Sequence, residues 1–76
     1  MIYIDPKLLK EAGKYCDEVV PGKKWVSIFF GDSTYPSDVA KGIALICKAV
    51  GKPLLDFRHS EGAYQSKPME VKLRFA

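Results

Sequence analysis

The spacing of apolar and polar residues changes several times along the 76-residue chain, and each change marks a different element. Two stretches carry apolar residues at intervals of three and four, which places them along one side of an α-helix. Four stretches alternate with period two or are apolar at nearly every position, which is typical of β-strands. We therefore predict an order of β-α-β-α-β-β, with strands over 2–4, 25–30, 54–59 and 69–75. The first helix is expected over 6–17, and the second is expected to be capped by Ser37 or Asp38 and to run to about residue 50.

Proline, glycine and capping residues mark the ends of these elements. Asp5 can accept hydrogen bonds from the free amides at the start of a helix, and Pro6 suits the first helical position because it has no amide proton. Pro21 and Gly22 suit the two central positions of a type II turn. Gly51 is the kind of residue that ends a helix. No repeat, low-complexity tract or linker interrupts the series, so one compact domain over 1–76 is expected.

The connectivity limits how these elements can be arranged. Two consecutive β-α-β units favour parallel pairing, and such crossovers are almost always right-handed. Strand 25–30 is the most apolar and is expected at the centre of the sheet. Both crossovers then step in the same direction, which places both helices on one face. The predicted fold is a small two-layer α/β (or α+β) domain of about four strands, with the second face of the sheet open.

The alternation within each strand predicts which side chains face the helices. The expected core consists of Ile2, Ile4, Val26, Ile28, Phe30, Leu55, Phe57, Val71, Leu73 and Phe75. The opposite face is expected to carry three aromatic residues beside three cations, with four further residues among them: Tyr3, Trp25, Phe29, Arg58, Lys72 and Arg74, with Ser27, Leu54, Asp56 and Glu70. A contiguous exposed aromatic patch usually marks an interaction site.

Other interpretations of these residues stay open. Trp25 and Phe29 can be core residues covered by an element that lies elsewhere than expected, or the face can bury them in a homodimer. Lys72 and Arg74 can be charges that keep an edge strand from pairing with another molecule.

Composition and charge narrow the class of protein. A hydrophobic fraction of 47% and a charged fraction of 28% are typical of a globular domain and not of a disordered chain or coiled coil. The net charge of +3 permits an anionic partner without requiring one. The positive charge is concentrated in the second half, because residues 39–76 hold seven Lys or Arg against three acids, whereas residues 1–38 hold five Lys against six acids.

The two cysteines and the lack of long apolar segments indicate the cellular compartment. Cys16 and Cys47 are too few for a disulfide framework and are expected in the core, on the apolar sides of the two helices. Residues 1–9 lack the apolar centre of a signal peptide, and no segment approaches 18 uninterrupted apolar residues. We therefore expect a cytoplasmic protein that does not enter a membrane.

Candidate catalytic chemistry is weak. His59, the only histidine, could act as a general acid or base with Asp56, Ser60 or Glu61, but the pattern offers neither a second positioned group nor a pocket. The loop at 31–34 lacks the glycine pattern of phosphate-binding loops, so a helix-capping loop is expected. Two cysteines and one histidine far apart in sequence do not form a metal ligand set. No catalytic residue, metal or cofactor is predicted.

The sequence thus favours a small non-enzymatic intracellular module that binds a macromolecule, with protein as the favoured partner. Adaptors and inhibitors, including those carried by phages and other mobile elements, are often chains of this size. Trp25 and Phe29 are expected to be hydrophobic anchors, and Arg58, Lys72 and Arg74 to steer the partner and form the rim.

The alternative function is binding of single-stranded nucleic acid on the same face. Tyr3, Trp25 and Phe29 would stack on bases, and the C-terminal cations would follow the phosphates. The dependence of binding on salt separates the two hypotheses, because only nucleic-acid binding should weaken steeply as ionic strength rises.

Overall fold

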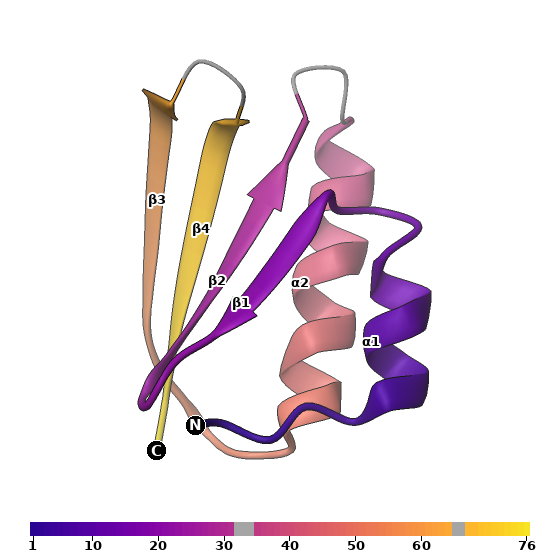
Figure 1. Ribbon diagram of the computed structural model, residues 1–76, viewed down its shortest axis with the longest axis vertical. Helices are drawn as coiled ribbons and strands as arrows, with labels where there is room; N and C mark the ends of the chain where they lie inside the picture. Colours follow the sequence, from indigo (N-terminus) through magenta and orange to yellow (C-terminus); the bar gives the residue numbers. More distant parts are fainter. Residues whose placement is uncertain (32–34, 65–66) are drawn as a thin grey trace.

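The computed structural model of the chain describes residues 1–31, 35–64 and 67–76. Figure 1 shows a four-stranded sheet with both helices on one side of it. In chain order the elements are α1 (Pro6–Ala12), β1 (Glu18–Pro21), β2 (Trp25–Phe30), α2 (Pro36–Val50), β3 (Leu54–Tyr64) and β4 (Lys67–Phe75). The predicted two-layer domain with two helices and four strands is confirmed.

The strands lie in the order β1-β2-β4-β3, and every neighbouring pair is antiparallel. The predicted parallel pairing is therefore wrong. β2 and β3 do run in the same direction, as a crossover through α2 requires, but β4 lies between them. The last strand follows β3 after a short connection and inserts beside β2, so both of its neighbours are antiparallel to it.

The first helix begins as predicted but ends earlier. The Asp5 carboxylate accepts a hydrogen bond from the Lys7 amide at 2.9 Å, and this caps the start of α1. α1 ends at Ala12 instead of residue 17, and Gly13 follows it. Glycine is about 1 kcal/mol less favourable than alanine within a helix, which helps to end α1 here.

The expected first strand is replaced by another one. Residues 2–4 lie outside regular secondary structure, although Ile2 and Ile4 are buried as predicted. The Ile2 amide donates a 2.8 Å hydrogen bond to the Gly22 carbonyl, which ties this segment to one end of the sheet. The additional strand is β1, which forms a hairpin with β2 and places Val19 opposite Ile28.

α2 lies close to the sheet because Gly42 has no side chain. A Cβ atom at this position would lie 3.2 Å from Cε1 of Phe30 and 3.5 Å from Cβ of Tyr15. The fully buried Phe30 ring therefore sits directly under the helix. The core beneath the helices consists of Ile2, Ile4, Ala12, Cys16, Val26, Ile28, Phe30, Ile46, Ala49, Val71, Leu73 and Phe75.

β3 differs from its prediction in burial and in length. Leu55 and Phe57 were expected in the core, but they are 58% and 49% exposed. β3 is the outermost strand beyond β4, so Phe57 lies past the layer of helices. Leu55 lies at a register shift between Leu54 and Asp56, which interrupts the alternation of side chains. Leu54, predicted on the opposite face, instead pairs with the buried Phe75. β3 and β4 also extend into the connection predicted over 61–68, of which residues 65–66 lie outside the described residues.

Within the described part of the chain, neither helix has the length and apolar character needed to cross a bilayer.

Candidate functional site

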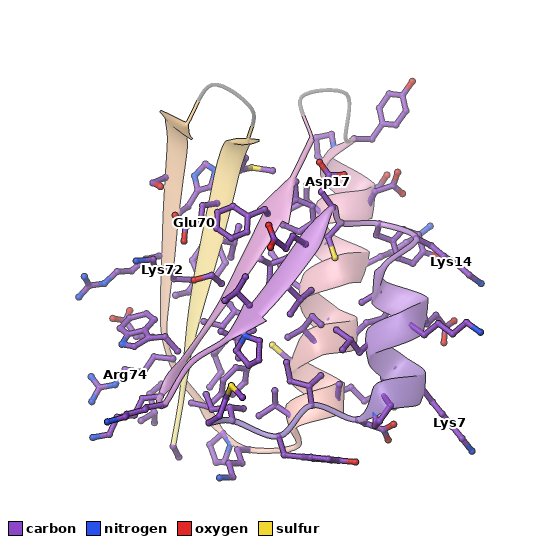
Figure 2. All side chains as sticks on the ribbon, viewed as in Figure 1. Lys7, Lys14, Asp17, Glu70, Lys72 and Arg74 are labelled. Carbon is purple, nitrogen blue, oxygen red and sulfur yellow. The ribbon has the colours of Figure 1, made fainter. Side chains whose placement is uncertain are left out.

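Alternate residues of the four strands form the side of the sheet that faces away from the helices, here called the open face. Across β2, β4 and β3 the register arranges them in three rows, Trp25–Arg74–Asp56, Ser27–Lys72–Arg58 and Phe29–Glu70–Ser60. In Figure 2, Glu70, Lys72 and Arg74 follow one another along β4, whereas Lys7 on α1 and Lys14 just after it project on the other side of the molecule.

β1 extends the open face beyond the residues that were predicted from sequence to lie there. Glu18 lies opposite Phe29, and Val20 lies opposite Ser27. Val20 is 43% exposed. Neither residue was a predicted site residue, because their segment was assigned to the end of a helix and to a turn. The signal that could have found them is the pair of β-branched residues Val19 and Val20 directly before a Pro-Gly turn.

Trp25 is the centre of an aromatic and cationic cluster on the open face. Arg58 reaches across β4 from β3, and its guanidinium carbon lies 5.1 Å from the centre of the indole. Such a contact contributes about 0.5–1 kcal/mol at an exposed site. Arg58 also lies 3.5 Å from Asp56, but both side chains are well exposed, so this ion pair adds little stability. Arg58 therefore helps to hold the partly buried Trp25 ring in place.

Arg74 lies between Trp25 and Asp56 in the register of the sheet. Its Nε atom is shielded from solvent and has no hydrogen-bond partner among the described residues. A buried donor without a partner is unfavourable by about 1–3 kcal/mol.

The charges on the open face are mixed. Its three cations, Arg58, Lys72 and Arg74, stand beside three carboxylates, Asp56, Glu70 and Glu18. A hollow of about 390 Å³ is lined by Trp25, Ser27, Arg58 and Lys72. The face therefore combines an aromatic hollow with charges of both signs, and it is less basic than the C-terminal half of the sequence suggests.

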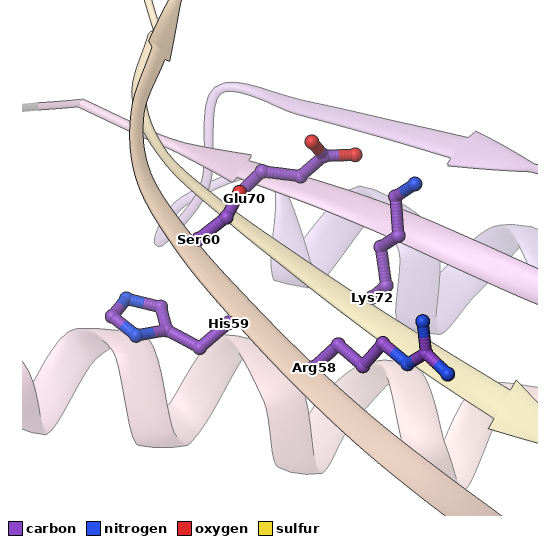
Figure 3. Close-up of a pocket in the computed structure, with 5 residues that line it drawn as sticks. All are labelled: Arg58, His59, Ser60, Glu70 and Lys72. Carbon is purple, nitrogen blue, oxygen red and sulfur yellow. The ribbon is translucent and has the colours of Figure 1, made fainter.

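A second hollow, of about 240 Å³, lies beside His59 and is lined by Arg58, His59, Ser60, Glu70 and Lys72. Figure 3 shows the imidazole directed away from the side chains of Glu70 and Lys72. Successive residues of a strand point to opposite faces, so His59 and Ser60 diverge. Asp56 and Ser60 therefore lie on the face opposite His59 and do not form the acid–base pair considered from sequence, and the side chain of Glu61, the third candidate, lies outside the described part of the structure.

Five of the six predicted site residues lie on the open face, and the sixth does not. The five are Trp25, Phe29, Arg58, Lys72 and Arg74. Tyr3 is 74% exposed but belongs to the N-terminal segment outside the sheet. Its prediction depended on a strand over 2–4 that does not form.

Cys16 is buried in the core as predicted, but it follows the end of α1 instead of lying on that helix; Cys47 on α2 is half-buried against the core. Burial raises the pKa of the Cys16 thiol, and the neighbouring Asp17 carboxylate raises it further. Burial also raises the pKa of Cys47. The Cys16 thiol donates a 3.1 Å hydrogen bond to the Ala12 carbonyl. Both thiols are therefore held in their protonated, unreactive form at neutral pH.

Two features considered from sequence concern metal ligands and the loop before α2. No cluster of three His, Cys, Asp or Glu side chains suitable for a metal occurs among them. The capping loop predicted at 31–34 lies outside the described residues at 32–34.

Comparison of the chain with protein-family models, with curated proteins and with solved structures finds no match. A function for this α+β domain can therefore be argued only from its own geometry.

Proposed function

We propose that this protein is a small non-enzymatic binding module that holds a protein partner on its open face. The observation that carries the proposal is the position of Trp25 and Phe29, two large aromatic residues on a side of the sheet that neither α1 nor α2 covers. Buried aromatic side chains supply much of the energy at protein interfaces. A partner that covers these two rings would gain most of its affinity there.

The charges around the rings support a protein partner over a nucleic acid. Phosphate groups placed along Arg58, Lys72 and Arg74 would also meet the carboxylates of Asp56 and Glu70. A protein surface can match charges of both signs, and rim charges of this kind mainly set the association rate and the orientation of the partner. Single-stranded nucleic acid is the alternative occupant of the face.

In the test, the wild-type protein and two variants are immobilised as bait, and the protein that each one retains is compared. Trp25→Ala should lose the retained partner, whereas Tyr3→Ala removes an equally aromatic but off-face ring and should keep it. Mass spectrometry identifies the retained protein, and titration of the purified partner then measures its affinity. Equal retention by Trp25→Ala and the wild type would contradict the proposal.

A second titration decides between protein and nucleic acid. Oligo-dT and oligo-U are added at low and at high salt while the emission of Trp25, the single tryptophan, is recorded. We expect no change in emission. Quenching that weakens steeply with salt would instead assign the open face to single-stranded nucleic acid.

A cytoplasmic location and an adaptor or inhibitor role remain predictions from the sequence. The same bait experiment addresses the second of these, because it identifies the protein on which the module acts.

A further inference from the structure

The two edges of the sheet are very different. β1 forms one edge, is four residues long and ends in Pro21, which cannot donate a ladder hydrogen bond. β3 forms the other edge and is eleven residues long. Natural proteins usually keep edge strands short or block them, because an open edge can pair with another chain. β1 fits that rule. β3 is much longer, and its register with β4 is regular from Asp56 to Glu61, between a shift at Leu54/Asp56 and another at Glu61/Tyr64.

The backbone of Phe57 shows which groups of β3 face outward. Its amide donates a 2.8 Å hydrogen bond to the Asp56 carboxylate of its own strand. This amide is therefore directed to the outer edge and away from β4. In an antiparallel ladder, outward-facing residues are the ones that exchange main-chain hydrogen bonds with an added strand.

Apolar side chains are exposed along this edge. Leu55 and Phe57 are 58% and 49% exposed, and Leu54 at the start of the strand is 43% exposed. Apolar residues at this density on an edge strand are typical of an interface.

The charged side chains on the open-face side of β3 are complementary to those of a second copy of the same strand. When two copies of β3 run antiparallel with Phe57 opposite Phe57, Asp56 of each copy lies opposite Arg58 of the other. This pairing occurs twice by symmetry. The pairs occupy non-hydrogen-bonded positions of the ladder, where side chains lie closest together.

We infer that the outer edge of β3 pairs with β3 of a second copy of this chain, around a two-fold axis at Phe57. The Phe57 amides then bond to the opposite Phe57 carbonyls, and each Asp56 carboxylate passes to Arg58 of the second copy. The two sheets become continuous, with both helix layers on one side and both open faces on the other. The pairing uses Arg58, which also contacts Trp25 on the open face, but it can be measured with no partner on that face.

The test measures the mass of the purified protein by sedimentation or light scattering over a range of concentrations. The wild type should form a dimer as concentration rises. Asp56→Arg and Arg58→Asp each place like charges opposite one another twice, so each should raise the dimer dissociation constant by about tenfold to a hundredfold. The double variant Asp56→Arg with Arg58→Asp restores both opposite-charge pairs and should recover the dimer.

Three results would overturn the inference: a monomer at every concentration, a dimer indifferent to either single charge reversal, or a double variant no tighter than the single ones. Circular dichroism of each variant confirms that the exposed substitutions leave the fold intact. Because the measurement uses no partner protein, its failure is separate from failure of the open-face proposal. Tyr3→Ala is the matched control and should dimerise like the wild type.

Discussion

Trp25 and Phe30 lie at opposite ends of β2 and on opposite sides of the sheet, so substituting each in turn tests the assignment of the two faces. Phe30 is fully buried beneath α2. Trp25 is partly buried on the open face and contacts Arg58. We predict that Trp25→Ala has a small effect on the free energy of unfolding and that Phe30→Ala has a large one.

The expected magnitudes follow from burial. Phe30→Ala leaves a cavity in the core and should lower stability by about 3–5 kcal/mol. Trp25→Ala loses a cation–π contact of about 0.5–1 kcal/mol and a similar amount from partial burial, which together come to about 1–2 kcal/mol. Small domains have only about 5–15 kcal/mol of stability in total, so Phe30→Ala can unfold the protein outright. Ile28→Val, at a fully buried position of the same strand, then provides a milder core control of about 0.5–1.5 kcal/mol.

Urea unfolding followed by far-ultraviolet circular dichroism is the appropriate assay, because Trp25→Ala removes the fluorophore. The midpoint and the slope of each transition give the change in stability. A loss for Trp25→Ala as large as that for Phe30→Ala would show that the indole is part of the core. The open face and the function proposed for it would then both be refuted.

Three further substitutions test local features of the fold. Gly42→Val should lower stability by about 1–3 kcal/mol in thermal unfolding, because even its Cβ would lie 3.2 Å from Phe30; a neutral effect would contradict the close packing of α2. Asp5→Ala should cost about 1 kcal/mol in urea unfolding through loss of the helix cap, and Asp5→Asn should recover most of it. Stability should fall as pH rises through the usual thiol pKa of 9.0, because the folded state keeps the Cys16 proton that the unfolded state releases; Cys16→Ala should reduce this fall, and identical pH profiles would contradict it.

The composition of the open face could be predicted from sequence although the strand pairing could not. Side chains alternate along any strand, whatever its neighbours. Val26 and Ile28 therefore face one side and Trp25 and Phe29 the other, whether β2 pairs in parallel or antiparallel fashion. The clean alternation of β4 fixes Lys72 and Arg74 in the same way. The wrong strand pairing therefore did not change the face on which these residues were predicted to lie.

The features that sequence missed depend on contacts between distant segments. Tyr15, Cys16 and Val19 continue the helical spacing of α1, so the local pattern gave no reason to end the helix and begin β1. The insertion of β4 between β2 and β3 depends on how the last strand docks against the others. The spacing of apolar residues along the chain does not indicate which strands become neighbours. Tyr3 was misplaced for the same reason, since residues 2–4 have strand-like alternation but no strand to pair with.

The error at β3 has a different cause and supports the inference drawn from it. Phe57 has the pattern of a core residue, yet in the single chain it lies beyond the edge of the helix layer, and Leu55 lies exposed at a register shift that interrupts the alternation. β3 lies at the edge of the sheet but resembles an interior strand. It has core-like side chains, its Phe57 amide faces outward, and its charges at Asp56 and Arg58 match those of a second copy of the same strand. Pairing with a second copy would give β3 a neighbour on both sides.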